Sequence, residues 1–390
     1  MRILWQSNAP WVSSGYGVQS RHFLPRIKAL GHDVAIMANF GLEGGMLTWD
    51  GMPVYPRRWD GYGQDIMCAH AQHFGADIIL SLYDTWVYRP ELYPAGIRWV
   101  PWLPIDHEPC PPPIAAKVSQ AYDRIVYSLF AQDSLAERGI DSHYVPHGVD
   151  TAMFRPVDKR KARESLNWPT DPYIVGLVAA NIGYPSRKAF SEHFRAFASF
   201  LKWHPGSLLY VHSHLAPNGE AQGMNLQEMV NELGIADSVL FADQYSYALG
   251  YDDATMSRVY NSLDVLMSAT MGEGFGVPII EAQACGVPVI VGDWTAMPEL
   301  LFAGEKVSKV DSHALLTPLA AYQFLPDPSA IADALETLYK RRNDEALRMA
   351  ARAGALAYDV DRVTAEYWAP VLATIEAKIK AEAGPRLEVA

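Results

Sequence analysis

Two glutamates frame a glycine-rich turn in the stretch GEGFGVPIIEAQACGVPVI, residues 272–290. Glu273 precedes the turn, and Glu281 lies eight positions later, inside the apolar run that follows. Two carboxylates at this spacing could accept hydrogen bonds from hydroxyl groups at opposite ends of one elongated ligand. The alternative is an ordinary helix start flanked by two solvated acids.

The turn between these glutamates predicts the start of a helix. Pro278 suits a first helical turn, where a missing N–H costs nothing, and Gly286 suits the helix end. The free N–H groups of such a start favour a diphosphate, and Gly274 and Gly276 let the backbone come close to it. Because carboxylates beside that anion would be repelled, they should face hydroxyl groups on either side. A nucleotide sugar has this layout: sugar hydroxyls, diphosphate, ribose hydroxyls.

A basic pair, Arg187 and Lys188, follows an apolar strand-like segment. Two cations there could stabilise the charge that develops on a departing diphosphate, and each charge-assisted hydrogen bond contributes roughly 1.5–3 kcal/mol. The alternative is an exposed pair that is only solvated.

Short apolar segments alternate with helical patterns along the chain, which indicates parallel sheets covered by helices on both faces. The alternation restarts after residue 155. The predicted fold is α/β, with two Rossmann-like doubly wound domains that face each other across a cleft. We expect domains at 1–155 and 156–362, with a C-terminal helix at 363–390, kinked near Pro370, that packs back on the first domain.

The composition is that of an ordinary globular protein of two-domain size. The 390 residues are 49% hydrophobic and 19% charged, with a formal net charge of −12. Residues 1–150 contain 11 Lys and Arg against 15 Asp and Glu, so neither half predicts a strongly basic surface. Nucleic acid and anionic membrane are therefore disfavoured as main partners.

The sequence favours a cytoplasmic protein. It has no run of 18 apolar residues that would predict a membrane span, and its first residues read as a strand without a signal-peptide pattern. Cys68, Cys110 and Cys285 form no C-x-x-C pair, which favours reduced thiols and argues against a zinc site.

Three segments carry a family resemblance: VPHGVDTAMFRP, LVAANIGYPSRKAF and VYNSLDVLMSATMGEGFGVPIIEAQACGVPVIVGDWTAMPEL. In this order they resemble the retaining nucleotide-sugar glycosyltransferases of glycosyltransferase family 4, which have the GT-B fold. The resemblance implies transfer of a sugar from a UDP- or GDP-sugar donor to an unidentified acceptor hydroxyl, without metal or cofactor. It also implies an acceptor site in the first domain and a donor site in the second.

The resemblance implies a role for each residue of the turn. Glu273 would contact donor sugar hydroxyls, and Glu281 would hold the ribose. The Phe275 side chain has packing as its alternative role. The loop positions that would bind sugar and phosphate are Gly274, Phe275, Gly276 and Val277.

The resemblance places Arg187 and Lys188 at the departing diphosphate. The family often has a further arginine shortly before this pair, where this chain has Asn181 and Ile182. Leaving-group stabilisation would then depend on the basic pair and the helix start. This departure keeps a non-catalytic nucleotide-sugar-binding protein open as an alternative, and a nucleotide-sugar epimerase or a phosphorylase on the same fold is another.

Two features of the first domain also match the family. The turn SSGYG resembles its glycine-rich turn, with Gly15 and then Gly17 as positions of close approach to the donor, although an ordinary turn is equally consistent. His107, after the segment WLPID, matches a histidine near the reacting sugar. The expected catalytic residues are His107, Arg187, Lys188 and Glu273.

Other chemically capable residues receive a structural interpretation. His147, Tyr127 and Ser128 are expected to pack, and the Asp-x-Asp formed by Asp359 and Asp361 follows a helical segment, which indicates surface charge and no metal site. Seven of the eleven tryptophans lie in residues 1–102, and we expect packing in a core to outweigh stacking on sugars. Candidates for contact with the nucleobase are Asp243, Gln244 and Tyr245.

Overall fold

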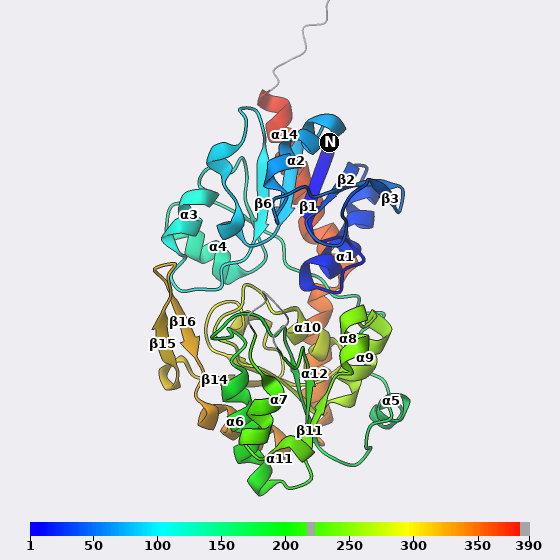
Figure 1. The fold of residues 1–390 in the computed structure, drawn as a ribbon, viewed down its shortest axis with the longest axis vertical. Helices are drawn as coiled ribbons and strands as arrows, with labels where there is room; N and C mark the ends of the chain where they lie inside the picture. The colour runs from blue at the N-terminus through cyan, green and yellow to red at the C-terminus, as the bar shows by residue number, and fades with distance from the viewer. Residues whose placement is uncertain (217–222, 383–390) are drawn as a thin grey trace, which may run out of the picture. The chain divides into compact units, whose positions relative to one another are not determined.

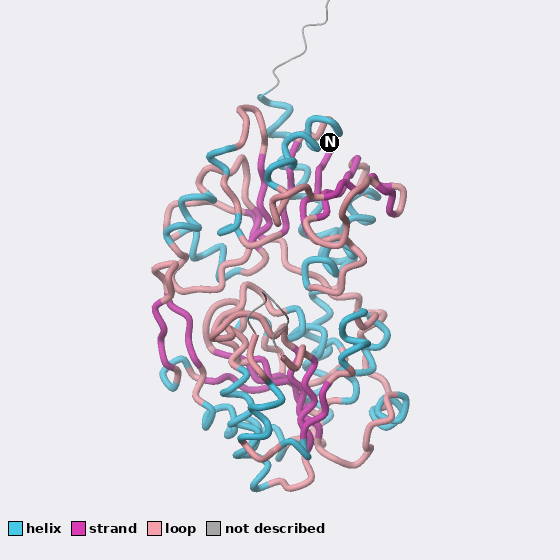
Figure 2. The backbone as a smooth tube through the Cα atoms, viewed as in Figure 1, coloured by secondary structure: helices cyan, strands magenta, loops and turns pink. Residues whose placement is uncertain are grey.

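The computed structural model describes residues 1–216 and 223–382, and its contacts divide the chain into two compact units (Figure 1). Strands and helices alternate through each unit (Figure 2). The predicted C-terminal helix extends into residues 383–390, which lie outside the described residues. Unit 1 comprises residues 1–105, 110–148 and the segment from 358 onward, and unit 2 comprises residues 106–109 and 149–357.

Unit 1 is built on an eight-stranded sheet in the order β3-β4-β2-β1-β5-β6-β7-β8. Neighbouring strands are parallel except β3 and β4, which form an antiparallel hairpin. The chain builds one side of the sheet from β1 and then adds β5 on the other side, so the strand order reverses between β1 and β5. The strands are β1 (Arg2–Ser7), β2 (Asp33–Ala38), β3 (Leu47–Trp49), β4 (Met52–Pro56), β5 (Ile78–Leu82), β6 (Trp99–Leu103), β7 (Ile125–Val126) and β8 (His143–Tyr144).

The central strands of unit 1 are buried along almost their whole length, as parallel strands covered on both faces should be. The covering helices include α1, which begins where Ser14 accepts a hydrogen bond from the Gly17 N–H. The helices are α1 (Gly15–Ala29), α2 (Gln64–Phe74), α3 (Pro112–Val118), α4 (Leu129–Ala136), α13 (Val360–Val363), η8 (Thr364–Trp368) and α14 (Ala369–Glu382), with the short turns η1 (Thr85–Val87) and η2 (Pro90–Leu92).

An aromatic core fixes the C-terminal segment on unit 1. Trp368 packs against Trp5 of β1, Phe23 of α1 and Trp102 of β6, with ring centroids 4.8–5.8 Å apart. Trp368 ends a π-helical turn, η8, two residues before Pro370, whose ring nitrogen cannot donate a helical hydrogen bond. The chain stays helical from Val360 to Glu382, and the irregularity ahead of Pro370 is this π-helical turn.

Unit 2 is built on a six-stranded parallel sheet in the order β11-β10-β9-β12-β13-β14, and its strand order reverses between β9 and β12. A separate antiparallel hairpin is formed by β15 and β16. The strands are β9 (Ile174–Val178), β10 (Leu208–His212), β11 (Val239–Phe241), β12 (Val265–Ser268), β13 (Val289–Gly292), β14 (Gly304–Val307), β15 (His313–Leu316) and β16 (Tyr322–Leu325).

Helices cover the unit 2 sheet, and the amphipathic α6 and α11 pack against each other. Among residues 1–216 and 223–382, we find no helix with both the length and the apolar character needed to cross a bilayer. The helices of unit 2 are α5 (Lys159–Ser165), α6 (Phe190–Trp203), α7 (Leu226–Glu232), α8 (Gln244–Leu249), α9 (Asp253–Ser262), α10 (Val277–Ala284), α11 (Pro328–Lys340) and α12 (Glu345–Ala355).

Candidate active site

The carboxyl ends of β9 and β12 lie side by side in unit 2, where the strand order reverses. Open parallel sheets bind ligands at such a point, because the loops that follow the two strands diverge there. Arg187 and Lys188 follow β9, and Glu273 follows β12. The sheet topology therefore brings the predicted basic pair and the first predicted glutamate to one edge.

Glu273 is paired with both members of the basic pair. Its Oε2 lies 2.9 Å from Arg187 Nη1, and its Oε1 lies 2.6 Å from Lys188 Nζ. Burial would raise the pKa of Glu273, but the two cations outweigh it and lower the pKa to about 2. The Lys188 ammonium carries three N–H donors, so its bond to Glu273 does not exhaust it. Glu273 thus holds both cations in fixed positions, and the further N–H donors of Lys188 can bind an anion.

Residues 106–109 bring His107 to the same cluster. His107 Nδ1 lies 2.7 Å from Asp106 Oδ1, and Asp106 Oδ2 lies 3.6 Å from Arg187 Nε. Burial would raise the pKa of Asp106, but the hydrogen bond from His107 and the charge of Arg187 lower it. Gly272 permits this approach, because a Cβ at that position would lie 2.2 Å from the Asp106 carbonyl oxygen. Asp106, to which the sequence analysis gives no role, orients His107.

The segment that carries His107 is attached to unit 2 by further contacts. The Glu108 N–H donates to the Tyr322 carbonyl over 3.0 Å, and the Tyr322 N–H donates back over 2.8 Å. Lys309 Nζ lies 2.6 Å from Glu108 Oε1. These bonds give His107 a fixed position in unit 2 although it follows β6 of unit 1 in the chain.

The glycine-rich turn begins α10, as predicted. Gly276 has φ +112° and precedes the first helical residue, Val277, and Pro278 occupies the first turn. A Cβ at Gly276 would also lie 2.7 Å from the Ile279 side chain, so only glycine fits. Phe275 is buried, which agrees with a packing role for its ring and leaves its backbone in the turn. Gly274 lies in the same turn, between Glu273 and Phe275.

Glu281 lies on α10 and contacts the neighbouring helix α9. Its Oε2 accepts a hydrogen bond from the Tyr260 hydroxyl over 2.7 Å. Burial, and then the Glu281 carboxylate, raise the pKa of Tyr260 well above its usual value, so the hydroxyl stays a donor. Tyr260 was not predicted, because nothing in the sequence pattern of α9 shows which of its faces meets α10.

Asn181 occupies the place where an arginine was expected. Its Nδ2 donates to the carbonyls of His214 and Met224 over 3.0 and 2.7 Å, and its Oδ1 accepts from the Met224 N–H over 2.8 Å. Asn181 therefore links the backbone of His214 to that of Met224. Ile182 is exposed and supplies no charge.

The nucleobase candidates surround the start of α8. Asp243 caps this helix by accepting from the Ser246 N–H over 2.8 Å, and Gln244 bonds the backbone of Ser213 and Leu215. Tyr245 is 74% exposed. Two of the three side chains are thus engaged in local structure, and their contact with a base stays a prediction.

The predicted glycines of unit 1 differ in their surroundings. A Cβ on Gly17 would lie 2.2 Å from the Val12 carbonyl oxygen, so Gly17 is required by the turn itself. A Cβ on Gly15 would meet nothing within 4 Å. Gly15 therefore has open space for a ligand, and its contact with the donor stays a prediction.

The residues given a structural interpretation have structural contacts. His147 stacks on Tyr127 with ring centroids 4.1 Å apart, and burial lowers its pKa to about 3. Ser128 caps α4. Asp359 caps α13, and Asp361 Oδ1 lies 2.7 Å from Arg26 Nε. Within the described part of the chain, no group of three or more His, Cys, Asp or Glu side chains is placed to hold a metal ion.

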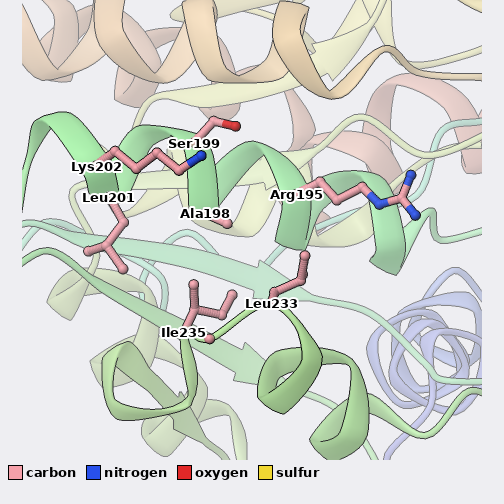
Figure 3. A pocket seen from close by; sticks show the side chains of 8 residues that line it. Arg195, Ala198, Ser199, Leu201, Lys202, Leu233 and Ile235 are labelled. Carbon is pink, nitrogen blue, oxygen red and sulfur yellow. The ribbon is translucent and has the colours of Figure 1, made fainter.

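A groove between α6 and residues 233–235 of unit 2 contains none of the predicted residues. Figure 3 shows Arg195, Leu201 and Lys202 on α6, with Leu233 and Ile235 across from them. The groove has two cations, but no carboxylate or histidine lines it. Its lining offers no chemistry that would compete with the cluster around Glu273.

The family model described as "Glycosyl transferases group 1" matches residues 174–341, which include the basic pair, both glutamates and α10. A D-inositol 3-phosphate glycosyltransferase from Acidothermus cellulolyticus is 31% identical over 193 residues, or 48% of this chain and 41% of that protein. One from Mycobacterium bovis is 32% identical over 166 residues, or 43% of this chain and 32% of that protein. The matches thus span less than half the length of these relatives.

Solved structures share the fold over almost the whole chain. Sucrose-phosphate synthase from Thermosynechococcus elongatus has a TM-score of 0.75 at 17% identity and covers 98% of this chain and 100% of its own. HepE from Anabaena, solved with UDP-glucose, has a TM-score of 0.69 at 16% identity and covers 96% of this chain and 100% of its own. The predicted α/β fold with two Rossmann-like GT-B domains is confirmed.

Proposed function

We propose that this protein is a retaining glycosyltransferase that moves a sugar from a nucleotide diphosphate donor to an acceptor hydroxyl. The observation that carries the proposal is the cluster of Arg187, Lys188 and Glu273 at the strand reversal of unit 2, next to the start of α10. Cations and helix N–H groups suit a diphosphate, and carboxylates suit hydroxyl groups. One site therefore has groups for each part of a nucleotide sugar.

The diphosphate is the leaving group in this proposal. Lys188 and Arg187 stabilise the negative charge that develops on it, and the N–H groups at the start of α10 add their dipoles. Glu273 holds the cations and accepts a hydrogen bond from a sugar hydroxyl. Glu281, whose position Tyr260 fixes, accepts hydrogen bonds from the ribose. This assignment uses no metal ion.

Retention of the anomeric configuration follows from a front-face reaction. Both glutamates have partners in hydrogen bonds, so neither is assigned as a covalent nucleophile. The departing phosphate oxygen takes the proton of the acceptor hydroxyl on the same face of the sugar. His107, oriented by Asp106, hydrogen-bonds the sugar beside this reaction.

The donor in this proposal is a UDP-sugar. The structures with a similar fold include HepE with UDP-glucose and a trehalose-6-phosphate protein from E. coli with UDP-2-fluoro glucose. The named relatives are transferases, which favours transfer over epimerisation. A GDP-sugar is the second donor to test.

Calorimetry with UDP, GDP and ADP, without metal, tests the proposal. We expect one nucleotide to bind the full chain, and Arg187→Ala to weaken it by about tenfold or more. Arg195→Ala, a change of an exposed arginine on α6, is the matched control. A folded protein that binds none of these nucleotides or their sugar conjugates would contradict the proposal. Formation of an epimerised donor without an acceptor would favour the epimerase.

A further inference from the structure

The strand reversal of unit 1, between β1 and β5, is surrounded by aromatic side chains. Tyr16 lies in the first turn of α1, Tyr62 in the loop after β4, Tyr83 directly after β5 and Trp86 in η1. Because β1, β2, β4 and β5 run parallel, the loops that follow them share one edge of the sheet. Ligands bind open α/β sheets at such an edge.

These four residues form a continuous aromatic cluster. Ring centroids lie 5.0 Å apart for Tyr16 and Tyr83, 5.3 Å for Tyr83 and Tyr62, and 6.1 Å for Tyr62 and Trp86. The tyrosines are partly exposed, and Trp86 is 52% exposed. Tyr62 and Tyr83 also pack against the core of unit 1, so the aromatic cluster lies at the rim of this core and presents part of its ring surface to solvent.

A carboxylate lies within the cluster. Asp84 is placed between Tyr83 and Trp86 in sequence, and it accepts a hydrogen bond from the Tyr16 hydroxyl over 3.1 Å. Burial, and then the charge of Asp84, raise the pKa of Tyr16 and of Tyr62. Both phenols therefore remain hydroxyl groups that can donate or accept hydrogen bonds at neutral pH.

Buried polar atoms at the same edge have no partner among the described residues. They are Asn8 Oδ1 after β1, Asn39 Nδ2 after β2 and Thr85 Oγ1 after β5. Each of these side chains is less than a tenth exposed, and the other amide atom of each asparagine is already hydrogen-bonded. Such an atom costs about 1–3 kcal/mol unless something satisfies it.

We propose that this edge of unit 1 binds the acceptor, and that the acceptor is an uncharged saccharide. The proposal rests on the proposed function and adds the substrate class. A pyranose ring has an apolar C–H face, which suits an exposed aromatic ring such as Trp86, and a rim of hydroxyls, which suits Asp84 and the tyrosine hydroxyls. Both kinds of group are present on the same loops.

The charges around the cluster favour a neutral acceptor over a phosphorylated one. Asp84 lies in the cluster, and Asp60 lies two residues before Tyr62. Two nearby cations are paired with acids, since Arg89 Nη2 lies 3.1 Å from Asp60 Oδ2 and Arg57 pairs with Glu43. A third, Lys117, donates from Nζ to the Trp86 carbonyl over 2.5 Å. A phosphate here would meet the Asp84 carboxylate, whose charge would repel it.

Saturation-transfer NMR on the full chain tests the proposal without any donor. The probes are methyl α-D-glucopyranoside, maltose and cellobiose, compared with glucose 6-phosphate and with vesicles of phosphatidylglycerol. We expect transfer to at least one neutral saccharide and none to glucose 6-phosphate or the vesicles. No transfer to any neutral saccharide, or stronger transfer to the phosphorylated sugar or to lipid, would overturn the proposal.

Variants locate the site. Trp86→Ala should weaken saccharide binding by about fivefold to tenfold, while Trp86→Phe, which keeps a ring, should recover most of it. Asp84→Asn should weaken it severalfold. The control is Trp203→Ala, which removes a tryptophan that is 82% exposed on α6 of unit 2. Equal binding by wild type and Trp86→Ala would place the saccharide elsewhere and overturn the assignment.

Nucleotide binding separates failure of this inference from failure of the proposed function. Trp86→Ala and Asp84→Asn should bind the nucleotide that wild type binds, with the same affinity, because Trp86 and Asp84 lie in unit 1. A chain that binds nucleotide but no saccharide contradicts the acceptor assignment alone. A chain that binds saccharide but no nucleotide contradicts the proposed function alone.

Discussion

The two strand reversals of this molecule have the same topology and different side chains. In unit 2, the loops after β9 and β12 carry two cations and a carboxylate in direct ion pairs. In unit 1, the loops after β1, β2, β4 and β5 carry tyrosines, a tryptophan and unsatisfied amide atoms. The sheet thus determines where a ligand binds, and the loop residues determine which chemistry it meets. The difference fits a charged donor in unit 2 and a neutral acceptor in unit 1.

The largest effect is expected at the two cations of unit 2. Replacing both Arg187 and Lys188 by alanine should lower the rate of sugar transfer by about a thousandfold, because it removes the cations that stabilise the leaving diphosphate. The rate of UDP release from a UDP-sugar measures this. The control is the double change Arg195→Ala and Lys202→Ala on α6, which removes two exposed cations from the same unit. A loss of less than tenfold would show that the reacting diphosphate does not depend on this pair.

The second-largest effect is expected at low pH, which should destabilise the ion pairs of Glu273. The folded protein lowers the pKa of Glu273 from 4.5 to about 2. Its ionised form therefore stabilises the fold fully above pH 4.5, and this contribution is lost as the pH falls toward 2. It amounts to at most about 3 kcal/mol. Wild type should lose thermal stability between these pH values more steeply than Glu273→Gln in calorimetric scans, and parallel curves would contradict the expected shift.

A smaller effect is expected at the second glutamate. Glu281→Ala should raise the KM for the donor about tenfold and leave kcat nearly unchanged, because ribose contacts are the same in the ground and transition states. Tyr260→Phe should reproduce a fraction of this, since it only releases the carboxylate from its partner. Steady-state kinetics with varied donor measure both. A fall in kcat with unchanged KM would move Glu281 from binding to the chemical step.

The smallest effect is expected at a second exposed tryptophan of unit 1. Trp59 is 80% exposed, but its ring contacts the Arg58 guanidinium, 3.6 Å away, and no contact joins it to the aromatic cluster among the described residues. Trp59→Ala should therefore change saccharide binding by less than about twofold, in contrast to Trp86→Ala. The same NMR titration measures this. An effect as large as that at Trp86 would show that exposure alone, and not the cluster, governs binding.

Much of the fold could be predicted because its signals are local. The buried strands of both sheets are short apolar runs, and the start of α10 is marked by Gly276 and Pro278. The β3–β4 hairpin was not predicted, although Asp50 and Gly51 both have positive φ, +48° and +69°, as a hairpin turn requires. Strands of three and five residues give too little alternation to distinguish them from a loop.

The site was predicted where residue type and position in the sequence suffice, and missed where partners come from distant segments. Arg187, Lys188 and Glu273 lie together, but the role of Asp106 depends on where residues 106–109 fold. The packing interpretation of the tryptophans is right for Trp5 and wrong for Trp86. Both lie in aromatic-rich segments, and only the packed structure shows which ring is left at the surface.

The segment 106–109 affects how this molecule can be divided. His107 lies between two strands of unit 1 in the chain, yet it makes its contacts within unit 2. A fragment of residues 149–357 would keep the basic pair and both glutamates, but it would lack this histidine and Asp106. A chimera that took residues 1–148 from a relative would also take that relative's residues at positions 106–109. Unit 1 can therefore be exchanged only with relatives whose residues at positions 106–109 also fit unit 2 of this chain.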